Sequence, residues 1–166
     1  MRPIVITGFM GCGKSKVARE LALRRNVEMV DLDEWITSRV GRSPAQIITE
    51  DGERAFREIE TNALREVLQS GEAGVIALGG GAWIEKVNRD LIDEYDCTSI
   101  WLNTPFEICW ERITASDEDR PLGRTREEAK ARYVRRKPVY ELARIHIVVN
   151  AEDTVDDLIS SIDASV

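Results

Sequence analysis

Histidine is nearly absent from this sequence, and cysteine is sparse. The chain has 166 residues with a single histidine, His146, and three cysteines. We expect His146 to be structural because it lies inside the strand-like segment 145–149, so acid–base chemistry must come from carboxylates, lysine or arginine. Cys12, Cys97 and Cys109 lie far apart in the chain, which excludes a Cys-x-x-Cys metal pair and favours reduced thiols.

Long apolar runs and a net positive charge are also missing. No run approaches the roughly 20 apolar residues that a membrane-spanning helix needs, and no signal segment is recognisable, so we expect a cytoplasmic protein. The formal net charge of −7 argues against nucleic acid or an anionic membrane as the main partner. With 43% hydrophobic residues the chain can bury one core, and we expect a single, monomeric domain over residues 1–166.

Short apolar runs alternate with amphipathic stretches along the chain. This alternation is typical of strands joined by helical crossovers, which form a parallel sheet covered by helices on both faces. The expected strands are 3–7, 27–31, 74–78, 98–102 and 145–149. The expected helices are 14–25, 33–40, 44–50, 52–69, 88–94, 105–114, 125–143 and 154–162. Ligands of such sheets bind at the carboxyl ends of strands, so we expect the site in the loops that follow the first four strands.

The segment after the first strand, GFMGCGKS (residues 8–15), fits the phosphate-binding pattern G-x-x-x-x-G-K-[ST]. Its glycines let backbone N–H groups turn toward phosphate oxygens, and the helix that begins at Lys14 adds the positive end of its dipole. Lys14 is expected to reach the β- and γ-phosphates, and the Ser15 hydroxyl to bind Mg²⁺. An ordinary glycine turn is the alternative, and the position between a strand and a helix argues against it. The segment therefore predicts a site for a nucleoside triphosphate with magnesium.

Two carboxylates, Asp31 and Asp33, end the second strand in the segment VDLDEW. Residues two apart in an extended segment point the same way, so we expect both to face one site. Asp31 suits the metal shell, directly or through a metal-bound water, and Asp33 suits the acceptance of a proton from an attacking hydroxyl. For Asp33 the alternative is an N-cap of the following helix.

Two further segments carry chemistry only in this context. Arg57 and Glu60, in GERAFREIE, are three apart on an expected helix, and alone they would indicate a weak surface ion pair. Gly79, Gly80 and Gly81 follow the third expected strand. Three consecutive glycines indicate that backbone approaches something closely, and a loose loop is the alternative.

The segment from 120 to 137 has a local excess of basic residues within an acidic chain. Part of this charge is expected on a solvated helix face. Arg120, in RPLG, lies in an irregular stretch typical of a flap, from which an arginine can neutralise charge on a transferring phosphoryl group. Arg136, in RKPVY, is a candidate for binding a carboxylate with two parallel hydrogen bonds.

Together these motifs resemble the shikimate kinase family. GFMGCGKS, the DLD pair, GERAFREIE, LGGG, RPL and RKPVY occur in the order and spacing of that family over nearly the whole chain. The resemblance implies transfer of the ATP γ-phosphoryl group to the 3-hydroxyl of shikimate, with Mg²⁺, in aromatic amino-acid biosynthesis. It also implies an α/β fold of the nucleoside-monophosphate-kinase type, with a five-stranded parallel sheet in the order 2-3-1-4-5. A shikimate-binding region near 33–61 and a mobile lid near 112–125 belong to the same expectation.

The resemblance also implies roles for particular residues. Lys14, Asp33 and Arg120 would be catalytic, with Asp33 as the base. The residues implied to bind ATP are Gly11, Cys12, Gly13, Lys14, Ser15, Lys16, Arg112 and Arg120, with Arg112 against the adenine. Those implied to bind shikimate are Asp33, Arg57, Gly79, Gly80, Gly81 and Arg136, with the two arginines on the carboxylate. Ser15 and Asp31 would hold the metal.

Two positions depart from the family pattern. Lys16 stands where a small hydroxyl residue is usual, and Gly123 replaces a leucine after RPL. We expect both to alter nucleotide affinity or lid closure and to leave the reaction unchanged. Two other functions stay open: a related kinase that acts on gluconate or a nucleotide, and a regulatory module that binds ATP or shikimate without turnover.

Overall fold

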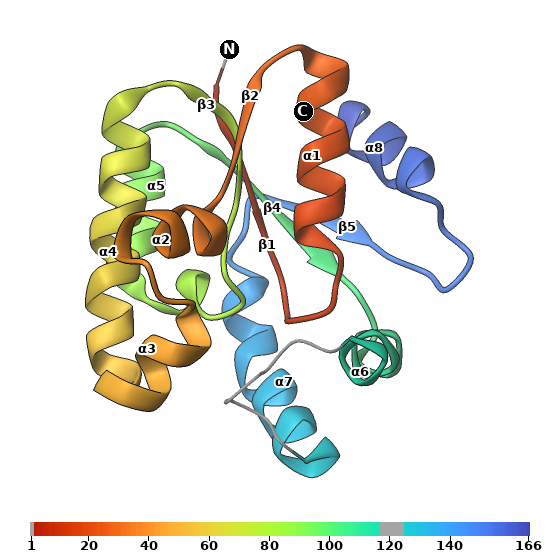
Figure 1. Ribbon diagram of the computed structural model, residues 1–166. Coiled ribbons are helices and arrows are strands. Elements are labelled where there is room, and N and C mark those ends of the chain that lie inside the picture. The colour runs from red at the N-terminus through yellow and green to blue at the C-terminus, as the bar shows by residue number, and fades with distance from the viewer. Residues whose placement is uncertain (1, 117–124) are drawn as a thin grey trace.

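The centre of the protein is a sheet of five parallel strands (Figure 1), seen in a computed structural model that describes residues 2–116 and 125–166. The strands are β1 (Ile4–Thr7), β2 (Glu28–Asp31), β3 (Ala73–Ala77), β4 (Thr98–Asn103) and β5 (Ile145–Val148). Their order is β2-β3-β1-β4-β5, and all neighbours are parallel. The expected fold and strand order are therefore confirmed.

Helices cover both faces of the sheet (Figure 1): α1 and α8 pack on one face, and α4 and α5 on the other. The helices are α1 (Lys14–Arg25), α2 (Leu32–Val40), α3 (Pro44–Asp51), α4 (Glu53–Ser70), α5 (Lys86–Glu94), α6 (Phe106–Ala115), α7 (Arg126–Tyr140) and α8 (Val155–Asp163), with a 3₁₀ turn η1 (Ala82–Ile84). Because both faces are covered, every residue of the middle strand β1 is buried.

Two helices differ from their expected bounds by more than one residue, and η1 was not expected. The helix expected over 125–143 ends at Tyr140, because the next N–H groups bond three residues back: Leu142 N–H to the Val139 carbonyl and Ala143 N–H to the Tyr140 carbonyl. The helix expected to begin at Asn88 begins at Lys86. The bonds of Leu142 and Ala143 tighten the end of α7 into a turn that leads into β5.

The strand register brings three functional segments to one edge of the sheet. Ala77 of β3 pairs with Ile6 of β1 on one side and with Asp31 of β2 on the other. The glycine loop after β1, the acidic end of β2 and the glycines after β3 therefore leave the sheet at the same level. Figure 1 shows α3, α6 and α7 standing around this edge.

The histidine and the cysteines lie within the fold as structural residues. His146 is on the edge strand β5, with Nε2 3.0 Å from the Ala143 carbonyl and its ring edge-on to Trp101. Cys12, Cys97 and Cys109 are buried and free. Within residues 2–116 and 125–166, none of the helices combines the length and apolar character needed to span a bilayer.

Gly74 of β3 lies against Val27, the residue before β2, and this close contact can be tested. A Cβ atom at Gly74 would lie 2.6 Å from Cβ of Val27, so we expect Gly74→Ala to lower the free energy of unfolding by about 1–3 kcal/mol. The measurement is urea denaturation of a double-mutant cycle with Val27→Gly. The loss from Gly74→Ala should be smaller in the Val27→Gly background, and an equal loss in both backgrounds would rule out this contact as the cause.

Candidate active site

A groove of about 970 Å³ opens at the carboxyl edge of the sheet. Its walls come from the glycine loop and the start of α1, the junction of β2 with α2, the start of α3, the inner face of α4 and the glycines after β3. Arg112 of α6 and Arg136 of α7 complete it. The sheet-edge expectation is therefore confirmed for the loops after β1, β2 and β3.

The glycine loop after β1 has the shape of a phosphate cradle. Gly11 has a φ of 76°, and a Cβ atom there would lie 2.7 Å from the carbonyl oxygen of Cys109, so a larger residue does not fit. Gly13 is the N-cap of α1 and has no side chain to cap the helix. The first N–H groups of α1 are therefore directed to the loop and its ligand.

Lys14, the first residue of α1, is buried at the centre of the loop. Its Nζ donates to the carbonyl oxygens of Gly8 at 2.9 Å and Phe9 at 3.0 Å. These carbonyls replace water as partners of the buried ammonium group, which a buried cation requires. A positive charge is thus held at the centre of the cradle.

Asp31 links the glycine loop to α2. The Ser15 hydroxyl donates to Asp31 Oδ2 at 2.5 Å, while Asp31 Oδ1 accepts the backbone N–H groups of Asp33 at 3.1 Å and Glu34 at 3.3 Å. Asp31 is therefore the N-cap of α2. Its second oxygen and the Ser15 hydroxyl form a pair of hard oxygen ligands in the groove, the kind that Mg²⁺ prefers.

The extended geometry that we expected through Asp33 is wrong. β2 ends at Asp31 and α2 begins at Leu32, so Asp33 lies in the first turn of a helix. The N-cap alternative for Asp33 is wrong as well, because Asp31 occupies that position. Both aspartates still line the groove, since this first turn stands directly beyond the carboxyl end of β2.

Arg57 and Glu60 form a buried ion pair on α4, with Nη1 and Oε2 2.7 Å apart. The interpretation of this pair as a surface salt bridge is wrong, because the Glu60 side chain is 0% exposed and that of Arg57 is 14% exposed. Arg57 Nη2 also lies 3.3 Å from a carboxylate oxygen of Glu53. Burial by itself lowers the pKa of Arg57, but the charges of Glu60 and Glu53 outweigh burial and raise it.

Glu60 has an unusually high proton affinity. Burial raises its pKa to about 7, against the opposing effect of Arg57, and the charges of Asp33 and Glu85 add to the rise. Glu60 Oε1 is enclosed, and it has no hydrogen-bond partner among the residues described. The groove therefore contains a carboxyl group whose pKa lies near neutral pH.

The glycines after β3 allow charged side chains to approach the backbone. A Cβ atom at Gly79 would lie 2.7 Å from Asp33 Oδ1 and 2.9 Å from Glu60 Oε1, and one at Gly81 would lie 2.6 Å from Cζ of Arg57. Side chains at these positions would displace the charged groups. The expectation of close backbone approach is confirmed, and the loose-loop alternative is excluded.

The end of α7 holds the same glycine loop from the other side. Arg136 is buried, and its Nη1 donates to the Gly80 carbonyl at 3.3 Å. The hydroxyl of Tyr140 donates to the same carbonyl at 2.5 Å, and Trp83 Nε1 donates to the Val139 carbonyl at 2.9 Å. Arg136 and Arg57 therefore both lie against the Gly79–Gly81 loop, and both line the groove.

The remaining expected nucleotide contacts divide into three groups. Lys16 and Arg112 line the groove, and Arg112 Nη1 donates to the Gly11 carbonyl at 3.3 Å. The Cys12 side chain is buried, and its carbonyl accepts from the Thr104 hydroxyl at 3.4 Å, so the loop after β4 supports the cradle from behind. Arg120 and Gly123 lie outside the described residues, as does most of the expected lid, whose first residues 112–115 belong to α6.

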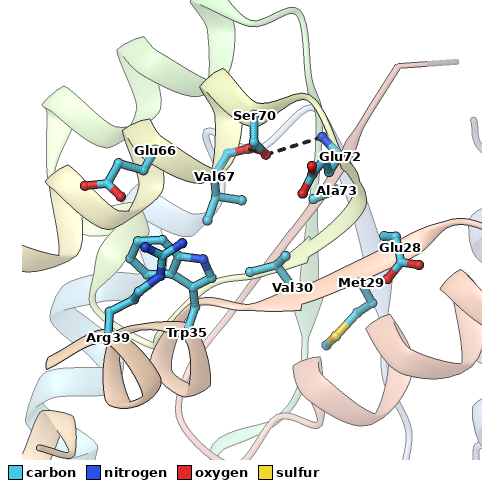
Figure 2. Close-up of a pocket in the computed structure, with 10 residues that line it drawn as sticks. All are labelled: Glu28, Met29, Val30, Trp35, Arg39, Glu66, Val67, Ser70, Glu72 and Ala73. Carbon is cyan, nitrogen blue, oxygen red and sulfur yellow. Dashed lines mark hydrogen bonds between the residues drawn. The ribbon is translucent and has the colours of Figure 1, made fainter. Parts of the chain in front are cut away.

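A second hollow of about 460 Å³ lies on the other side of α2 (Figure 2). Arg39 stacks on the ring of Trp35, with Cζ 4.8 Å from the ring centroid, next to Val30 and Val67. The floor begins at Glu28 and Ala73, the first residues of β2 and β3. This hollow is therefore at the amino ends of the strands, away from the edge where the functional segments meet.

Glu60 and Tyr140 were not predicted as site residues. Glu60 lies on the face of α4 that carries Phe56, Ala63 and Leu64, all of them buried. A carboxylate inside an apolar helical stripe is a sequence signal for a buried charge, and this signal could have identified Glu60. For Tyr140 the sequence contains no such signal, because its contact with Gly80 joins residues 60 apart in the chain.

Comparison with known proteins finds similarity over nearly the whole chain. A family model described as shikimate kinase matches residues 10–165. A shikimate kinase from Ruegeria pomeroyi is 33% identical over 99% of this chain and 84% of its own length. One from Streptococcus thermophilus is 36% identical over 88% of this chain and 90% of its own.

A solved structure resembles the fold closely. The shikimate kinase from Acinetobacter baumannii in complex with shikimate matches with a TM-score of 0.91 and 31% sequence identity. The match covers 99% of this chain and 92% of that chain. The similarity in sequence and in fold thus extends over essentially the whole molecule.

The raised pKa of Glu60 predicts a pH-dependent stability. The ordinary pKa of a glutamate carboxyl group is 4.5, and in the folded protein burial raises the pKa of Glu60 to about 7. Between these values the folded state binds the proton more tightly than the unfolded state. The stability that Glu60 contributes is therefore present below about pH 4.5 and is lost as the pH rises through about 7. When the pH is raised from about 5 to about 8, the unfolding free energy of Glu60→Gln should therefore increase by about 1–3 kcal/mol relative to that of wild type.

Urea denaturation of both proteins at the two pH values checks this prediction. Glu53→Gln is the matched control, since Glu53 also pairs with Arg57 but is half exposed to water; its difference from wild type should be the same at both pH values. An equal difference for Glu60→Gln at the lower and the higher pH would show that Glu60 does not titrate in this range.

Proposed function

The chain belongs to the shikimate kinase family and is an ATP-dependent phosphotransferase, and from this premise we propose how its own residues carry out the transfer. We propose that the groove places the γ-phosphoryl group of ATP against the 3-hydroxyl of shikimate, giving shikimate 3-phosphate and ADP. The observation that supports this most directly is the presence, in one groove, of the phosphate cradle, Asp33, the buried Arg136 and the largely buried Arg57.

We propose that the nucleotide end holds ATP through the glycine loop. The N–H groups of Gly11, Gly13 and the first turn of α1 would bind phosphate oxygens, and Lys14 would exchange its two carbonyl partners for the β- and γ-phosphates. Lys16 and Arg112 supply further positive charge along this wall. Arg120, outside the described residues, would add its charge at the transferring group.

Ser15 and Asp31 fit Mg²⁺, because their oxygens already meet at 2.5 Å beside the cradle. When bound, the metal neutralises charge on the β- and γ-phosphates. Asp31 also caps α2, so this residue fixes the helix that carries Asp33 relative to the phosphates.

At the acceptor end, Arg57 and Arg136 would bind the carboxylate of shikimate, since guanidinium groups bind carboxylates with parallel hydrogen bonds. The backbone of Gly79–Gly81 would lie against the ring. Asp33 would accept the proton of the 3-hydroxyl group. At the same time the oxygen of that hydroxyl would form a bond to the γ-phosphorus, and the bond from the γ-phosphorus to the β-phosphate oxygen would break. The proton stays on the Asp33 carboxyl group, and ADP leaves with the bond electrons.

The two alternative functions are weaker matches to this groove. A gluconate or nucleotide acceptor would not use the guanidinium groups of Arg57 and Arg136 together with a glycine backbone that excludes side chains. A module that only binds ligands would not need a carboxylate such as Asp33 beside the phosphate cradle. A coupled ADP-release assay with shikimate, quinate, gluconate and nucleoside monophosphates separates the three functions.

Asp33→Asn tests the proposed base. The amide is close to the carboxylate in shape but accepts a proton far less readily, so we expect kcat with shikimate to fall at least about 100-fold. ATP affinity, measured by calorimetry, should stay within about threefold, because the cradle is untouched. Full turnover in this variant would remove Asp33 from the mechanism.

Arg57→Ala and Arg136→Ala test the carboxylate site. Each variant loses one guanidinium group, so the KM for shikimate should rise by about 10-fold or more, with a much smaller change in the KM for ATP. The coupled assay over a range of shikimate concentrations gives both constants. If the KM for shikimate is unchanged in both variants, the two arginines do not hold the acceptor.

A further inference from the structure

Arg132 of α7 contains a guanidinium nitrogen that the fold encloses without a partner. Its Nη1 atom is covered by protein, and across residues 2–116 and 125–166 it makes no hydrogen bond. An enclosed donor without an acceptor costs free energy. Arginine remains protonated in proteins, so this group cannot escape the cost by becoming neutral. The fold therefore keeps a positive charge here with one of its nitrogens enclosed and without a hydrogen-bond partner among the described residues.

This charge lies next to the acceptor end of the groove. Arg132 is one helical turn before Arg136 on α7, and residues four apart lie on the same face of a helix. Arg136 forms part of the groove wall and donates to the Gly80 carbonyl. Arg132 therefore stands directly behind the group that we assign to the carboxylate of shikimate.

The surroundings of Arg132 leave positive charge in excess. Burial lowers its pKa, and the like charges of Arg136 and Arg135 add to this effect, while Glu53 and Glu128 oppose it. Glu53 already pairs with Arg57 at 3.3 Å. Glu128 in turn accepts the backbone N–H of Thr125. Both opposing carboxylates are thus engaged with other groups, and a bound anion would supply further negative charge.

We propose that Arg132 is a specificity-determining residue whose charge makes the acceptor end select an anionic acceptor over a neutral one of the same shape. The inference rests on the proposed function, in which Arg57 and Arg136 contact the carboxylate directly. Arg132 acts on that carboxylate through its electric field from one turn behind. At an intermediate dielectric, a unit charge several ångströms away changes the affinity for an anion by about three- to tenfold.

The test compares shikimate with its methyl ester, which has nearly the same shape and no charge. Dissociation constants for both are measured by calorimetry on wild type, Arg132→Gln and Arg135→Gln. The two substitutions remove the same charge from the same helix, but Arg135 is exposed to water, which makes it the matched control. We expect Arg132→Gln to weaken shikimate binding about three- to tenfold. Binding of the ester should stay within about twofold, and Arg135→Gln should change neither ligand.

Several outcomes would overturn the proposal. Equal weakening of shikimate and ester in Arg132→Gln would assign Arg132 a structural role, and so would a comparable change in the KM for ATP. Unchanged shikimate binding would remove the residue from acceptor selection. Arg132→Lys keeps the charge and should keep the preference for the anion. If Arg132→Gln does not fold, Arg132→Leu provides a neutral variant with an apolar side chain suited to an enclosed position.

The two proposals fail in distinguishable ways. Absence of ADP release from wild type with shikimate would refute the proposed function. Normal turnover of shikimate by wild type, together with an unchanged preference for the anion in Arg132→Gln, would refute only the role of Arg132.

Discussion

The glycine loop Gly79–Gly81 lies in contact with charged side chains from three helices, and the geometry of the acceptor end depends on this contact. The first glycine leaves room for the carboxylates of Asp33 and Glu60, and the last leaves room for the guanidinium group of Arg57. The carbonyl of the middle glycine accepts two hydrogen bonds from α7. Larger residues in this loop would push α2 and α4 away from the sheet edge, where the two substrates are proposed to meet.

The acceptor end concentrates charge that most proteins keep in water. Arg57 and Glu60 are buried as a pair, and Arg136 is buried against a backbone carbonyl. Removing such groups from water is unfavourable unless partners replace the lost hydration. On α7, Nη1 of Arg132 is enclosed without a hydrogen-bond partner among the described residues. In the proposed function a small carboxylic acid would complete this arrangement, whereas a neutral polyol would leave it incomplete.

A protein with a net charge of −7 can still bind two anionic substrates, because several of its cations line one groove. Lys14 and Arg112 lie at the nucleotide end, and Arg57 and Arg136 lie at the acceptor end. The acidic surface elsewhere disfavours non-specific binding of anions. The ends of the strands hold these groups in register, since Ala77 of β3 pairs with both neighbouring strands.

The two aspartates show how far sequence reasoning reached and where it stopped. The pattern of strands, the glycine loop and the acidic pair placed Asp31 and Asp33 at one sheet edge, and both line the groove. The reason given for Asp33 was wrong, because a helix begins immediately after Asp31. Whether a chain continues as strand or turns into helix there depends on capping and packing, which two-residue alternation does not capture.

Glu60 illustrates the same limit. The sequence predicts its spacing from Arg57 on one helix. Its burial was not predicted, although Glu60 lies on the apolar face of α4. The partners of Tyr140 and the enclosure of Arg132 depend on segments far apart in the chain.

The sequence by itself determined the parallel sheet, the phosphate cradle and the family, because these follow from periodicity and from motifs whose residues are close together in the chain. Only the tertiary structure decided which charges are buried, which carbonyl two donors share and, among the described residues, which guanidinium nitrogen has no hydrogen-bond partner. Burial and pairing arise when distant segments exclude water from one another, and local sequence carries little information about that exclusion.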